Sequence, residues 1–180
     1  MPTALFVIAP GNFRDEELFH AKEELEKAGI KTGIASTKKG EYFGRFGGKA
    51  VAGFAASEIR ASDYDIIIFV GGPGVMQNRL HENRDFLRLA QDASDCTKVL
   101  AAICMGPKIL AGAGVLRGKR LTTFPDAEAI EMIRKNGGIY TGMGVEECER
   151  GNGRKLITAN GPENSREFAK MIIDALKKRN

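Results

Sequence analysis

The sequence predicts an α/β domain in which a mostly parallel sheet is covered by helices on both faces. Short apolar runs alternate with amphipathic stretches along the chain, which is the pattern of strands joined by crossover helices. The runs at 65–70 and 98–103 are apolar after their first residue, as expected of strands buried on both faces. A chain of 180 residues with 43% hydrophobic content has room for one packed core, and we assign residues 1–180 to a single domain.

The N-terminal third predicts a strand, a helix and a second strand. Residues 5–9 are an apolar strand, and a helix begins at Asp15 and ends at Gly29, because glycine suits a helix C-terminus. A second strand follows at 32–36. The segment 42–54, rich in glycine and aromatic residues, favours a hairpin or a pair of short edge strands. The helix has apolar residues at helical spacing, at Leu18, Ala21, Leu25 and Ala28.

The rest of the chain continues this alternation. After the strand at 65–70 we predict a helix at about 83–93, a strand at 98–103 and a helix at 108–113. A strand at 120–124, a helix from Asp126 to Arg134, short strands at 139–140, 144–148 and 155–159, and a last helix after 161–163 follow. The last two strands are joined by a turn at 151–153. The last helix carries an apolar stripe at Phe168, Met171, Ile172, Ala175 and Leu176.

A glycine-rich loop at 71–74 follows the strand at 65–70. It lacks the G-x-G-x-x-G pattern and a Gly-Lys-Ser/Thr sequence, so a nucleotide site is not indicated. The loop instead favours close approach of the backbone, with N–H groups turned toward the strand ends. Open α/β sheets bind their ligands there.

Cys104 is the strongest candidate for chemistry in the chain. It lies between the strand at 98–103 and a helix whose first turn holds Pro107, and small residues two positions away on each side, Ala102 and Gly106, permit a tight turn. This pattern resembles a nucleophile elbow, which exposes its central side chain. Free N–H groups and the helix dipole would lower the pKa of the thiol there. The alternative is a small apolar residue at the end of a core strand.

The composition excludes several classes of function. Basic and acidic residues, 27 and 23, are interspersed at a net charge of +4, which indicates a salt-bridged surface and no nucleic-acid partner. No apolar run approaches the roughly 18 residues of a membrane span, and no signal peptide precedes the first strand. We therefore expect a cytoplasmic protein with no membrane partner.

The three cysteines, Cys96, Cys104 and Cys148, have no C-x-x-C spacing, and only two histidines accompany them. An odd set of this kind predicts neither a disulfide framework nor a metal site. We also expect no cofactor. Cys96 and Cys148 are interpreted as structural residues.

Six segments in register resemble the DJ-1/ThiJ/PfpI superfamily over nearly the whole chain. They are the acidic turn at 10–18, the segment at 64–72, the A-I-C-x-G-P sequence at 102–107, the segments at 113–118 and 122–125, and the start of the last helix at 161–168. The resemblance implies a flavodoxin-like three-layer sandwich with a cysteine nucleophile elbow. It also implies a homodimer or higher homo-oligomer. Members are described as cysteine peptidases, glyoxalases, deglycases, chaperones or redox sensors, so membership alone does not choose the function.

The chain departs from the family pattern in the turn after the first strand. Family members place a glutamate there, where its carboxyl hydrogen-bonds the cysteine sulfur. By ungapped count this position is Arg14, although Asp15 or Glu16 could replace the glutamate if the turn is rearranged. A guanidinium at the sulfur would stabilise a thiolate.

Further departures remove the partners of a peptidase. Met105 and Phe124 replace histidines that family branches carry near the cysteine, and Met76 replaces a glutamate that oligomeric peptidases supply from a neighbouring subunit. We expect Phe124, Met76 and Gly71 to line the pocket. A hydrolase without a histidine at such positions forfeits about 10²- to 10⁴-fold in rate.

Two functions are therefore preferred. In the first, the protein is a cysteine-dependent lyase or hydrolase that acts on small α-oxoaldehydes or their adducts. Cys104 would be the nucleophile, the N–H groups of Gly72 and Met105 would hold an oxyanion, and Asp15 or Glu16 would carry protons. In the second, it is a non-catalytic redox sensor or stress-protective protein whose thiol meets an oxidant. A PfpI-like cysteine peptidase or amidase is a third, disfavoured interpretation.

Overall fold

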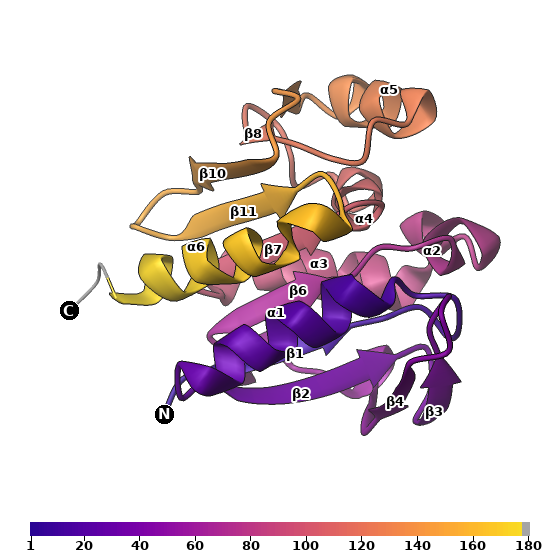
Figure 1. The fold of residues 1–180 in the computed structure, drawn as a ribbon. Helices are drawn as coiled ribbons and strands as arrows, with labels where there is room; N and C mark the ends of the chain where they lie inside the picture. The colour runs from indigo at the N-terminus through magenta and orange to yellow at the C-terminus, as the bar shows by residue number, and fades with distance from the viewer. Residues whose placement is uncertain (178–180) are drawn as a thin grey trace.

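The computed structural model describes residues 1–177, and its centre is a seven-stranded sheet in the order β10-β11-β7-β6-β1-β2-β5 (Figure 1). All neighbours in it are parallel except the antiparallel pair β10 and β11. The five central strands therefore follow the flavodoxin-like order. The strands are β1 (Thr3–Val7), β2 (Lys31–Ser36), β5 (Phe54–Ala55), β6 (Ile66–Phe69), β7 (Val99–Ile103), β10 (Val145–Glu149) and β11 (Lys155–Ala159).

Helices cover both faces of the sheet, as the alternating pattern predicted. Helices α1 (Asp15–Lys27) and α6 (Ser165–Lys177) pack side by side on one face, in front of the sheet in Figure 1. Helices α3 (Arg84–Cys96) and α4 (Gly106–Gly112) cover the other face, and α5 (Ala127–Lys135) packs on α4. Strands β6 and β7 are buried along their whole length between these layers.

The predicted hairpin is confirmed as the antiparallel pair β3 (Gly40–Phe43) and β4 (Lys49–Ala52). The predicted strand at 120–124 is wrong in extent, because β8 (Arg120–Leu121) has two residues and pairs only with β9 (Ile139–Tyr140). The chain turns away after β8. The short helix α2 (Gly74–Gln77) was not predicted. Short 3-10 helices lie at Ala56–Glu58, Ala61–Asp63, Leu80–Glu82 and Pro162–Asn164.

The parallel strands bring three loops to one edge of the sheet. The loop after β1 leads into α1, the glycine loop after β6 leads into α2, and the turn after β7 leads into α4. The carboxyl ends of parallel strands are where such folds bind ligands. Among the described residues, none of the helices is both long and apolar enough to cross a membrane.

Candidate active site

Cys104 occupies a left-handed turn between β7 and α4. Its φ is +59°, a conformation that side chains rarely adopt, and the residue is 7% exposed. Its carbonyl accepts hydrogen bonds from the Phe124 N–H at 3.0 Å and the Thr123 hydroxyl at 2.7 Å, and its own N–H donates to the Ala159 carbonyl at 2.9 Å. The segment after β8 thus turns back to hold the cysteine backbone, which shortens that strand.

The glycine loop after β6 packs directly against this turn. A Cβ on Gly71 would lie 2.6 Å from the Ile103 carbonyl oxygen and 2.7 Å from the Cys104 Cβ, so only glycine fits. Gly72 has a φ of +103°. The backbone N–H groups of Gly72 and Met105 lie near enough to the Cys104 sulfur to lower the pKa of the thiol. The contacts of Gly71 confirm the predicted close approach of the backbone at the strand ends.

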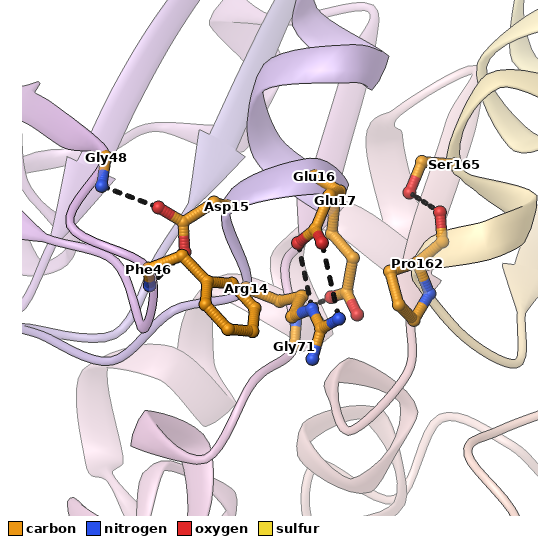
Figure 2. A network of polar contacts seen from close by, with 9 residues as sticks. All are labelled: Arg14, Asp15, Glu16, Glu17, Phe46, Gly48, Gly71, Pro162 and Ser165. Carbon is orange, nitrogen blue, oxygen red and sulfur yellow. Dashed lines mark hydrogen bonds and ion pairs between the residues drawn. The ribbon is translucent and has the colours of Figure 1, made fainter.

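A buried carboxyl, that of Glu17, faces the Cys104 thiol from the first turn of α1. The Glu17 side chain is fully buried, and its Oε2 accepts a hydrogen bond from the Gly71 N–H at 2.8 Å (Figure 2). Its other oxygen, Oε1, is buried without a hydrogen bond of normal geometry, and the thiol interacts with this carboxyl. Burial raises the pKa of Glu17 to about 8. Glu17 is therefore mostly a neutral acid at pH 7.

The pKa of the Cys104 thiol is raised from its ordinary value, which contradicts the prediction of a lowered one. Burial is the main cause, followed by the negative charge of Glu17 and the closeness of its carboxyl to the thiol, whereas the Gly72 and Met105 N–H groups lower the pKa. Burial thus favours the neutral forms of both acids, and a negative charge on one of them disfavours ionisation of the other.

The three residues expected to act on the sulfur from this turn have other partners. Arg14 Nε donates to Glu16 Oε2 at 2.8 Å, and the guanidinium lies 4.7 Å above the Phe46 ring centre. Asp15 accepts hydrogen bonds from the Phe46 N–H at 2.8 Å and the Gly48 N–H at 2.6 Å, which ties α1 to the β3–β4 hairpin (Figure 2).

Sequence reasoning missed Glu17, although the helical pattern contained a signal for it. In an α-helix, positions four and eight residues apart lie on one face. Ala21 and Leu25 stand at these distances from Glu17 and are buried with it. An acid within an apolar stripe is the mark of a buried, partnered carboxyl.

A cavity of about 570 Å³ opens beside Cys104. Of the three residues predicted to line it, Met76 and Phe124 do so, and Gly71 lies behind the cysteine. The other lining residues are Arg14, Arg45, Gly72, Pro73, Gln77, Cys104, Met105, Asp126, Pro162 and Glu163. No histidine lines it in the described part of the chain.

The two histidines lie outside this cavity. His20 lines a neighbouring open hollow with Arg14 and Glu16, and His81 is buried on the 3-10 helix Leu80–Glu82. Within residues 1–177, no group of three histidine, cysteine or acidic side chains is arranged to hold a metal ion.

The fold and site together define a class of protein: a flavodoxin-like sandwich with a buried glutamate facing a cysteine in a left-handed turn after a central strand. The model of the DJ-1/PfpI family matches residues 2–175, and the chain belongs to this family.

Individual proteins agree with this assignment. The chain is 39% identical to an uncharacterized protein of Methanocaldococcus jannaschii over 98% of this chain and 83% of that one. It is 31% identical to a deglycase of Pyrococcus abyssi over 67% of this chain and 72% of that one. A ThiJ/PfpI domain protein from Brachyspira murdochii superimposes with a TM-score of 0.90 at 30% identity, over 99% of this chain and 98% of that one.

Proposed function

We propose that the protein is a Cys104-dependent enzyme that acts on small α-oxoaldehydes or on the adducts these form. The observation that carries the proposal is the pairing of a buried, proton-bearing Glu17 with the Cys104 thiol at the wall of a cavity. Relatives named deglycases, such as the Pyrococcus abyssi protein, support carbonyl-adduct chemistry. Glu17 takes the proton-carrying role that sequence reasoning gave to Asp15 or Glu16.

The first step is addition of the sulfur to the aldehyde carbon. A C–S bond forms, the carbonyl π bond breaks, and the thiol proton reaches the new hydroxyl by way of Glu17, so the product is a neutral hemithioacetal. The N–H groups of Gly72 and Met105, which act on the sulfur before the reaction, would stabilise the oxyanion during it.

The second step is an internal redox reaction that needs no cofactor. Glu17 first releases its own proton to water, and the carboxylate then removes the proton from the hemithioacetal carbon and returns it to the neighbouring ketone carbon, while the hydroxyl proton moves from the first oxygen to the second. The first carbon becomes a thioester and the second an alcohol, so one is oxidised as the other is reduced. Water then cleaves the thioester, which releases a 2-hydroxy acid and restores the thiol.

Consumption of methylglyoxal by the purified protein tests this proposal. Cys104→Ala should abolish turnover, and Glu17→Gln should lower kcat by about 10²- to 10⁴-fold, the usual cost of losing a general acid–base group. Cys96→Ala is the matched control, because Cys96 is an exposed thiol at the end of α3 and should leave turnover unchanged. Equal turnover by the wild type and Cys104→Ala would refute the proposal.

A redox sensor is the second candidate, favoured by the two backbone N–H groups that meet at the sulfur. Two equivalents of peroxide would convert the thiol to a sulfinate and yield two molecules of water. The N–H groups of Gly72 and Met105, with the Glu17 proton, would then hydrogen-bond the new oxygens. Intact mass after mild peroxide treatment should show two added oxygen atoms on Cys104, and an unmodified Cys104 would refute this function.

The peptidase interpretation stays disfavoured, since a peptidase needs a base that returns a proton to the leaving amine. No histidine lines the cavity within residues 1–177. A cytoplasmic location and a homodimer or higher homo-oligomer remain predictions from the family resemblance.

A further inference from the structure

Lys108 is a fully buried cation next to the cavity that holds Cys104. It lies on α4, one helical turn after the cysteine, and its side chain has no exposed surface. Its Nζ donates hydrogen bonds to Glu128 Oε1 at 2.7 Å and to Met76 Sδ at 3.3 Å. The proposed reaction does not use this group.

The charge of Lys108 is poorly compensated. The Glu128 side chain is 69% exposed, so water screens its charge, and a thioether is a weak acceptor. Among residues 1–177, Lys108 forms no ion pair with a second carboxylate. The buried ammonium has three N–H donors, and its acceptors within residues 1–177 are one carboxylate and one sulfur. It is therefore short of an acceptor.

A neighbouring histidine does not change this balance. His81 is buried on the 3-10 helix that packs on α4, and its Nδ1 has no hydrogen-bond partner. Burial, and then the charge of Lys108, lower the pKa of His81, so His81 is neutral at pH 7.

The Met76 side chain lies between the ammonium and the cavity. Met76 contacts Nζ on one side and lines the cavity beside Cys104 on the other. Methionine is unbranched and adapts its rotamer easily. A small shift of this side chain would let an anion in the cavity reach the ammonium.

We propose that Lys108 is a specificity-determining residue that selects α-oxoaldehydes which also carry a carboxylate. This inference rests on the proposed aldehyde chemistry of Cys104. The sulfur adds to the aldehyde carbon, and the carboxylate displaces the Met76 side chain and gives Nζ its missing acceptor. The competing role for Lys108 is structural: it would only tie α5 to α4 through Glu128.

Alkylation of Cys104 by two reagents of similar size tests whether the positive charge of Lys108 attracts an anion into the cavity, and this test does not depend on turnover. Iodoacetate carries a carboxylate and iodoacetamide is neutral, and mass spectrometry of the Cys104 peptide separates this thiol from Cys96 and Cys148. Lys108→Met should lower the ratio of the iodoacetate rate to the iodoacetamide rate by about fivefold, the effect of one partly screened charge. Met76→Ala should raise the ratio.

Glu128→Gln is the matched control because it breaks the same ion pair but keeps the ammonium. It should leave the ratio unchanged or raise it. An unchanged ratio in Lys108→Met, or an equal fall in Lys108→Met and Glu128→Gln, would overturn the proposal. Methionine replaces the lysine by an apolar chain of similar length and leaves only an exposed carboxylate behind, so this variant should fold; thermal unfolding checks this.

Turnover of 4,5-dioxovalerate, an α-oxoaldehyde that carries a carboxylate, and of methylglyoxal then separates the two proposals. Lys108→Met should lower kcat/KM for 4,5-dioxovalerate by about fivefold and leave that for methylglyoxal unchanged. If the wild type consumes neither aldehyde while the alkylation ratio still falls in Lys108→Met, the aldehyde chemistry is refuted and anion recognition by Lys108 stands. If both aldehydes are consumed and the preference does not move, Lys108 does not select the substrate.

Discussion

Replacing Glu17 by Gln should make the protein more stable than the wild type, and the gain should grow with pH. Glutamine keeps the shape and an oxygen that can accept the Gly71 N–H, but it cannot ionise. The wild-type carboxyl has a pKa of about 8 in the fold against an ordinary value of 4.5, because it is fully buried. A carboxyl with a raised pKa favours the folded state less as it ionises, so wild-type stability falls between these two pH values.

The magnitude follows from the difference between the two pKa values. Each pH unit over which the Glu17 carboxyl is ionised only in the unfolded chain lowers the free energy of unfolding by about 1.4 kcal/mol. The full span from pH 4.5 to about 8 therefore lowers it by up to about 5 kcal/mol. At pH 7 the corresponding figure is about 3 kcal/mol. Below pH 4.5 the free energies of unfolding of the two proteins should differ only by a constant amount, which reflects the replacement of the carboxyl by an amide.

Urea unfolding of both proteins at pH 4, 6, 7 and 9 measures this dependence. Glu16→Gln is the matched control on the same helical turn, since a backbone hydrogen bond and the partly exposed ion pair with Arg14 lower the pKa of Glu16. Its effect should be small and of opposite sign: a slight loss of stability above pH 4.5 that disappears at lower pH. A stability difference between Glu17→Gln and wild type that stays constant from pH 4 to 9 would refute the reasoning.

Three further substitutions test the packing of the site. Gly71→Ala should destabilise the fold by about 1–3 kcal/mol in urea unfolding, because the new Cβ has no room beside Cys104. Gly53→Ala is the control and should cost far less, since nothing lies within 4 Å of a Cβ there. Equal losses of stability in the two variants would contradict this explanation. Asp15→Ala should free the two hairpin amides that it binds, seen as faster hydrogen exchange at unchanged methylglyoxal turnover; lost turnover would restore Asp15 as a catalytic candidate. Thr123→Val removes a hydrogen bond to the Cys104 carbonyl and should cost about 1 kcal/mol and slow Cys104 alkylation; an unchanged alkylation rate would show that this bond does not position the thiol.

Much of the fold was predictable because hydrophobic periodicity is strong in this chain. The strands β6 and β7 have apolar runs typical of buried parallel strands, and α6 has a clear apolar stripe. The strand β8 was predicted too long because Thr122 and Thr123 have strand-like side chains. Their hydrogen bonds go instead to the Met143 and Cys104 carbonyls, a tertiary preference that local sequence does not reveal.

The site was predictable only in part. The position of Cys104 and its approach by the glycine loop followed from small residues at fixed spacing, which act locally. The identity of the acid that faces the sulfur, Glu17, could not be predicted in this way, because an ungapped count assumes that the turn after β1 has the same length as in the family. Asn12 adopts a positive φ there, and the chain reaches α1 with Glu17 facing inward and Arg14 facing Glu16. The raised thiol pKa was missed for the same reason.

The protonation state of Glu17 at pH 7 tests the central claim most directly, since the proposed chemistry needs a neutral acid beside Cys104. Carbon-13 NMR of the glutamate side-chain carboxyls, with Glu17→Gln to assign the signal, reports this state in the intact protein. The account predicts a carboxylic acid signal for Glu17 at pH 6 to 7 that changes to carboxylate near pH 8. A Glu17 signal that is already fully carboxylate at pH 6 would contradict it.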